Sequence, residues 1–115
     1  GGAFGDGAGG IEVSGMGSVD QSALEKALAK RLEKFQYCYE KALLSDASLS
    51  GNIMMGWKIN TSGKAWSIQV VKSQMNNSKL HGCITKEIRA VPFPRPKGGN
   101  LYVKFPFNFS ANLEC

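Results

Sequence analysis

The chain has 115 residues, enough for one ordinary domain, and its 43% hydrophobic and 20% charged content excludes both a wholly disordered chain and a large multidomain enzyme. Eight of its 14 glycines lie within the first 17 residues, and the first 20 residues hold three acidic side chains and no basic one. The 14 Lys and Arg residues that follow outnumber six acidic ones, which leaves that part with a net charge of +8. We therefore expect residues 1–17 to form a flexible Gly-rich linker and residues 18–112 to form the folded domain.

The first regular elements are expected at the end of this linker. Ile11–Met16 alternates apolar residues with polar or small ones, a pattern that allows a short strand docked on the domain. A helix begins near Asp20, a good N-cap residue, and its apolar residues recur at the three- and four-residue steps of one helix face. These apolar residues are Leu24, Leu28, Leu32, Phe35, Tyr39 and Leu43.

A period-two pattern then predicts a β-hairpin. Residues 52–60 and Ala65–Ser73 alternate apolar with polar side chains, and Gly63 between them supplies the positive φ that a tight turn needs. The alternation breaks at Val70–Val71, which indicates either a bulge or burial on both faces.

A second helix follows the hairpin. Asn76 or Asn77 can cap its start, Pro92 ends it, and Leu80–Val91 carries apolar residues at helical spacing. Gly82 weakens the helix, and we explain its presence by close packing.

The last strand has the clearest alternation of the chain. The odd-numbered residues from Leu101 to Phe109 are all apolar, and their even-numbered neighbours are mostly polar. Pro106 lies within this strand and has no N–H to donate, which favours a position at the edge of a sheet.

These elements together predict an α+β fold. It is a three-stranded antiparallel sheet, ordered helix-hairpin-helix-strand along the chain, with two helices packed on one face and an extra N-terminal strand if Ile11–Met16 docks. The crossover through the second helix places the last strand beside the first hairpin strand and leaves the last strand at the edge.

The three cysteines predict neither a metal site nor a catalytic thiol. Cys38, Cys83 and Cys115 lack the paired spacing of zinc ligands, and His81 is two residues from Cys83, so the two side chains do not face each other on a helix. We therefore expect no metal, no cofactor and no enzymatic activity. Cys38 and Cys83 lie on the inward sides of the two helices, where they form either a disulfide or two reduced core thiols. The small size of the domain favours the disulfide.

Several short motifs follow one another along residues 20–110. They are Phe35-Gln36-Tyr37-Cys38-Tyr39-Glu40-Lys41, Leu49-Ser50-Gly51, Gly63-Lys64, Asn76-Asn77, Cys83-Ile84, Phe93-Pro94-x-Pro96, Lys97-Gly98-Gly99 and Phe105-Pro106-Phe107-x-Phe109. This ordered set resembles the TonB C-terminal-domain superfamily, and more closely the AgmX/PglI-type C-terminal domains of gliding-motility proteins. The chain departs from the pattern at Val91-Pro92, where such domains often place an aromatic residue and a base.

The resemblance implies a periplasmic interaction module at the end of a protein anchored in the inner membrane. Such modules transmit energy or force to an outer-membrane or periplasmic partner by binding an extended peptide segment. An edge strand suits this role, because its backbone groups can pair with an added strand. We expect the partner-binding residues on the last strand to be Tyr102, Lys104, Pro106, Asn108 and Ser110.

The positive charge leaves other interpretations open. Lys58, Arg95, Lys97 and Lys104 favour an acidic partner segment or the anionic surface of the envelope. Nucleic-acid binding is an alternative because of the charge of +8 and the aromatic residues, although the bases are scattered over all elements and form no stripe. Self-association is a third reading, either as a homodimer through edge pairing or with Ile11–Met16 covering the edge of its own chain.

Overall fold

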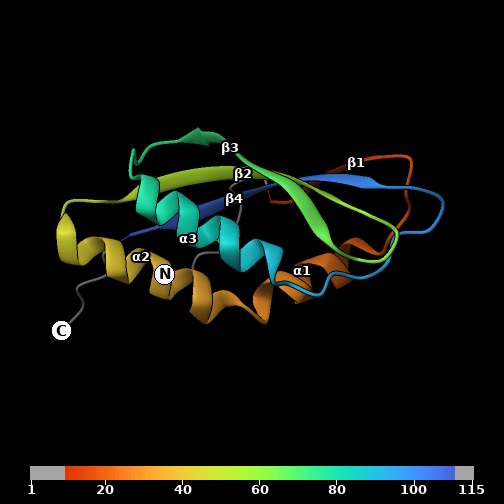
Figure 1. Ribbon diagram of the computed structural model, residues 1–115, viewed down its shortest axis with the longest axis horizontal. Helices are drawn as coiled ribbons and strands as arrows, with labels where there is room; N and C mark the ends of the chain where they lie inside the picture. The colour runs from red at the N-terminus through yellow and green to blue at the C-terminus, as the bar shows by residue number, and fades with distance from the viewer. Residues whose placement is uncertain (1–9, 111–115) are drawn as a thin grey trace.

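The computed structural model describes residues 10–110, which form three helices and four strands (Figure 1). In chain order these are β1 (Glu12–Gly15), α1 (Gln21–Ala29), α2 (Leu32–Ser45), β2 (Gly51–Ile59), β3 (Ala65–Ser73), α3 (Ser78–Arg89) and β4 (Leu101–Phe109). The strands form one antiparallel sheet in the order β1-β4-β2-β3, and the helices lie together on one of its faces. The predicted α+β class is confirmed. Of the expected linker, residues 1–9 lie outside the described residues, as do residues 111–112 of the expected domain.

The first helix of the prediction is two helices in the structure, so the expected number of helices was wrong. Asp20 does cap the start, since its side chain accepts a hydrogen bond from the Ser22 N–H at 3.0 Å. The break comes at Lys30 and Arg31, where the Arg31 backbone departs from helical geometry (φ −107°, ψ 12°). The apolar spacing runs through this break without interruption, and both helices bury their apolar stripes against the twisted sheet.

The hairpin of β2 and β3 forms as predicted. Its turn is closed by the side-chain oxygen of Asn60, which accepts hydrogen bonds from the backbone of Ser62 and Lys64, both at 3.0 Å. The pairing register shifts at Val70–Val71, so the predicted bulge is confirmed. Burial on both faces is excluded, because Val70 and Val71 are 36% and 45% exposed.

The last strand lies beside the first hairpin strand, as expected. All nine residues of β4 pair with β2, from Gly51 opposite Phe109 to Ile59 opposite Leu101. The predicted edge position was wrong for the first part of β4, because β1 pairs with Leu101–Lys104. Over residues 10–110 the sheet therefore has four strands, and the short N-terminal strand that the pattern allowed is present.

The glycine at the end of β1 lets the chain approach the start of β4. Gly15 has a φ of +109°, and a Cβ at this residue would lie 2.7 Å from the carbonyl oxygen of Asn100. Ser18 and Lys97 then exchange two backbone hydrogen bonds of 2.8 and 2.9 Å. These contacts fix the segment that joins β1 to α1.

An aromatic cluster fills the core between β4 and α2. The Phe35 and Phe107 ring centroids are 4.8 Å apart, and those of Tyr39 and Phe109 are 4.9 Å apart. The predicted disulfide is confirmed: Cys38 of α2 and Cys83 of α3 are bonded, with their Cα atoms 5.7 Å apart. The bond ties the two helices to each other across the same face of the sheet (Figure 1).

Candidate functional site

His81 and Cys83 both have structural partners. The Nε2 atom of His81 lies 2.8 Å from the carbonyl oxygen of Met75 and 3.1 Å from the Ser73 hydroxyl. Cys83 is held in the disulfide and carries no thiol. Within residues 10–110, no three His, Cys, Asp or Glu side chains gather as metal ligands. Over the same residues, no helix is long and apolar enough to cross a membrane.

Two of the five predicted binding residues lie in the part of β4 that pairs with β1. Tyr102 is opposite Ser14 and Lys104 is opposite Glu12 in the antiparallel register. The Lys104 ammonium is 5.9 Å from the centroid of the Tyr102 ring, within the range of a cation–π contact. The Tyr102 side chain crosses Gly56 of β2, where a Cβ would lie 2.7 Å from the Tyr102 hydroxyl. Both side chains therefore occupy the face of the sheet that carries no helix.

The other three predicted residues lie beyond the last β1 pair. Pro106 is opposite Met54 and Asn108 is opposite Asn52, both on β2. Pro106 is buried and Asn108 is half-buried, while Ser110 follows the end of β4 and is exposed. The predicted set is thus divided between a part that β1 covers and a part that extends past β1.

β1 is small compared with the strand that it covers. It has four residues against the nine of β4. Glu12 and Ser14 are exposed, and the apolar side of the segment consists of buried Ile11 and half-buried Val13. Most of what holds this strand is therefore its backbone pairing with β4 together with one buried aliphatic side chain.

A groove on the helix side of the sheet escaped the sequence analysis. It lies between α1 and Pro92–Pro94, two segments more than 60 positions apart in the sequence, and its volume is about 540 Å³. The one local sign of this groove in the sequence is the Pro-Phe-Pro run, and the same run also predicts the end of a helix. The pairing of the two segments was not visible from local patterns.

The helix-free face also has features that the sequence did not bring together. Trp66 of β3 is 45% exposed, and the Lys58 ammonium lies 4.8 Å from its ring centroid. Lys58 is two residues after Gly56 on β2, and Gly56 is the residue that the Tyr102 side chain crosses. Two aromatic side chains, each with a lysine beside it, therefore lie on this face.

Comparisons with known proteins give one structural likeness. No family model matches the sequence, and no curated protein matches it. Among solved structures, the chain is similar to the NMR solution structure of the TonB C-terminal domain of Helicobacter pylori, residues 179–285 of that protein. The two sequences are 20% identical, the match covers 84% of this chain and 100% of the other, and the TM-score is 0.46.

Proposed function

We propose that the domain is a non-catalytic interaction module that binds an extended peptide of a cell-envelope partner by strand addition to the outer edge of β4. The observation that carries this proposal is the pairing of β1 with Leu101–Lys104. A segment of only four residues pairs there through its backbone, so this edge accepts an added strand.

The construction of β4 supports its use as a template. Its inner edge pairs with β2 over all nine residues. On the side that faces the core, the rings of Phe107 and Phe109 pack against aromatic rings of α2. A strand held in this way loses little further freedom when a peptide pairs with it, which favours binding.

The disulfide supports a location in the cell envelope. A bond between Cys38 and Cys83 is stable in an oxidising compartment such as the periplasm, and such bonds are rare in the cytosol. Together with the motif resemblance to TonB and AgmX/PglI-type domains, it supports a periplasmic domain of a protein anchored in the inner membrane. The partner is then an outer-membrane or periplasmic protein of an energy-transducing or motility system.

A partner strand has to compete with β1 for the backbone of Tyr102 and Lys104. Because β1 is attached to the same chain, its effective concentration is high, of the order of mM for a short flexible connection. A partner segment therefore replaces β1 only where its own backbone and side-chain contacts with Leu101–Lys104 are stronger than those of the four β1 residues.

The proposal is tested by removing β1 as a competitor and supplying it as a separate peptide. Neighbouring strand residues direct their backbone groups to opposite edges, so the double variant Glu12→Pro/Val13→Pro must remove at least one donor toward β4. The matched control is Glu12→Ala/Val13→Ala, which shortens the same side chains and keeps both donors. The probe is an acetylated, amidated peptide with the sequence of residues 10–17.

We expect the peptide to shift the amide resonances of Leu101–Lys104 in the proline variant and to bind the alanine control at least about tenfold more weakly, because the control keeps its own strand. The same proline variant then serves to select partner peptides from a displayed library, with the 10–17 peptide as competitor. Resonance changes confined to the helices would exclude β4 as the binding strand.

A second candidate function is favoured by the helix-free face. Trp66 with Lys58 and Tyr102 with Lys104 combine exposed or half-exposed rings with positive charge, the arrangement on which single-stranded nucleic acids stack. Its test is binding of a mixed-sequence single-stranded DNA at several salt concentrations, with Trp66→Ala as the variant. Absence of salt-dependent binding by the unmodified protein removes this candidate.

A further inference from the structure

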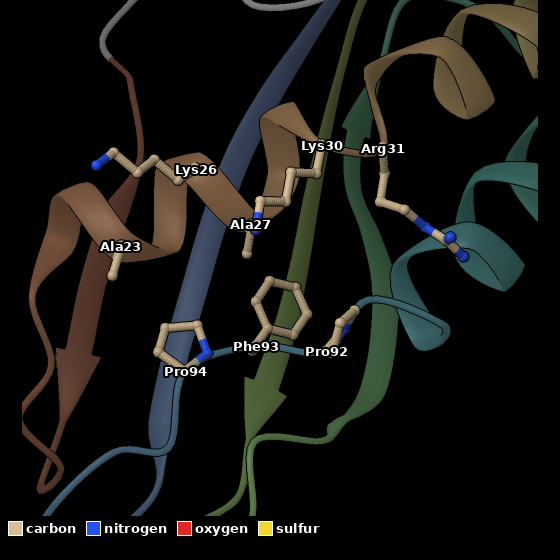
Figure 2. A pocket seen from close by; sticks show the side chains of 8 residues that line it. All are labelled: Ala23, Lys26, Ala27, Lys30, Arg31, Pro92, Phe93 and Pro94. Atoms are coloured by element: carbon tan, nitrogen blue, oxygen red, sulfur yellow. The ribbon is translucent and has the colours of Figure 1, made fainter.

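A groove lies between α1 and the Pro92–Pro94 segment. Figure 2 shows the Pro92–Pro94 segment running alongside α1, with Ala27 facing Phe93 and Ala23 on the side of Pro94. Because the side chains of the two alanines are small, a space of about 540 Å³ remains between the two segments. This volume lies within the usual range of ligand sites.

The floor of the groove is rigid. The Phe93 N–H donates to the carbonyl oxygen of Gly63 at 3.1 Å, which attaches the loop to the β2–β3 turn. The Phe93 ring also packs on Trp57, a fully buried residue of β2, with ring centroids 5.9 Å apart. A ligand therefore meets a surface that is already in place.

The charges at the groove are all positive. Lys26, Lys30 and Arg31 line it, and none of the acidic residues between positions 10 and 110 does. In Figure 2 the Lys30 side chain extends toward the groove above Phe93, whereas the Lys26 side chain points away along α1 and Arg31 turns toward α3. Lys30 is thus the cation nearest to the middle of the floor, with Lys26 and Arg31 at the two sides.

Arg31 retains hydrogen-bonding capacity at this site. One of its terminal nitrogens is 3.4 Å from a carboxylate oxygen of Glu87 on α3, and the side chain is 29% exposed. Its Nε atom is buried and has no hydrogen-bond partner among residues 10–110. The buried Nε is closed to a ligand, so a second carboxylate can reach only the terminal nitrogens of this partly exposed side chain.

We propose that this groove is a second binding site, which takes an acidic peptide segment of a partner protein. A carboxylate of the segment binds between Lys30 and Arg31, and a neighbouring apolar side chain packs on Phe93, Pro94 and the two alanines. The positively charged lining, and the course of Pro92–Pro94 alongside α1, commit the site to an acidic extended peptide. The site lies on the helix side of the sheet and does not depend on strand addition at β4.

The direct test uses a pair of synthetic probes. The acidic probe is acetyl-Glu-Leu-Glu-Pro-Glu-amide, and the control probe carries Gln in place of each Glu. We expect the acidic probe to shift the amide resonances of Ala27, Lys30, Arg31 and Phe93 and to bind at least about tenfold more tightly than the neutral one, with an affinity that falls as salt is added. Equal binding of the two probes would overturn the proposal.

Matched variants separate this groove from general positive charge. Lys30→Glu is expected to weaken the acidic probe at least about tenfold, whereas Lys34→Glu, an exposed lysine of α2 that does not line the groove, changes it little. Glu87→Gln removes the carboxylate that competes for Arg31, so it is expected to tighten binding a few-fold. Equal losses in the Lys30 and Lys34 variants overturn the proposal.

The other occupants of the groove give distinct results. Binding of vesicles of anionic phospholipid that Lys30→Glu abolishes, without binding of the acidic probe, assigns the groove to a lipid surface. Concentration-dependent dimerisation that Lys30→Glu abolishes assigns it to a second copy of the chain. Either result overturns the peptide assignment. The proline variant of β1 should bind the acidic probe normally, so a failure of the β4 proposal and a failure of this one remain distinguishable.

Discussion

The N–H of Phe93 donates to the carbonyl oxygen of Gly63, so the loop after α3 is attached to the turn between β2 and β3. Gly63 has a φ of +85°, and a Cβ at this residue would collide with the carbonyl oxygen of Phe93. The turn and the floor of the groove therefore depend on one residue that has no side chain.

Gly63→Ala is expected to destabilise the domain by at least about 2 kcal/mol, because it combines an unfavourable backbone conformation with a contact against main-chain atoms that cannot move freely. The measurement is urea-induced unfolding followed by circular dichroism. The same variant should weaken the acidic probe, since it displaces Phe93. A change smaller than about 0.5 kcal/mol would contradict the role given to Gly63.

Gly82→Ala is the matched glycine substitution and should have the opposite sign. Gly82 lies within α3, is exposed, and a Cβ there meets no atom within 4 Å, so the sequence-based explanation of close packing was wrong. Alanine stabilises an exposed helix position by about 0.5–1 kcal/mol relative to glycine. Loss of stability in this variant would indicate a contact that the described residues do not provide.

Removing the disulfide should cost much of the stability of the domain. The cysteines are separated by 45 positions, and closing a loop of this length stabilises the folded state by about 4 kcal/mol in the loop-entropy estimate. Cys38→Ala/Cys83→Ala is compared with the unmodified chain by urea unfolding. Alkylation without reductant, followed by intact mass, checks the bond itself. Two protected thiols are expected, and modification of all three contradicts it.

Tyr39 should make the domain sensitive to alkaline pH. Burial raises the pKa of Tyr39 above its ordinary value of 10.0, and its hydroxyl donates to the carbonyl oxygen of Leu49 at 2.5 Å. The folded state therefore keeps the phenol proton at a pH where the unfolded chain loses it. The associated stability is complete below about pH 10 and is lost as the pH rises through the raised pKa.

Tyr39→Phe isolates this effect. The variant should lose about 1 kcal/mol at neutral pH because the hydrogen bond is gone. Its unfolding free energy should then fall less steeply than that of the unmodified chain between pH 9 and pH 11, since the two proteins differ only in the Tyr39 hydroxyl. Parallel pH profiles would show that Tyr39 ionisation is not coupled to unfolding.

The parts of the fold that local physics determines were predictable. The Asp20 and Asn77 caps, the hairpin turn at Gly63 and the bulge at Val70–Val71 all depend on residues that are close in sequence. Periodicity also placed β4 beside β2, because a crossover helix leaves few other positions for it.

The remaining features depend on contacts between distant segments. β1 has four residues, and its position against Leu101–Lys104 cannot be read from its own weak alternation. The edge assignment of β4 failed for this reason. The break between α1 and α2 at Lys30 leaves no mark in the apolar spacing, and without that break the groove beside α1 was not visible.

The antiparallel pairing of β1 with β4 has a mechanical consequence. The β1 pair nearest to the upstream chain is Glu12–Lys104, and β4 continues from there toward Phe109. A tensile load applied between residue 10 and Ser110 therefore enters both strands from the same end and opens their backbone bonds one after another, beginning at that pair. β4 itself stays in the sheet, because β2 holds it over all nine residues. Tension applied at residue 10 thus peels β1 away first and uncovers the backbone of Tyr102 and Lys104.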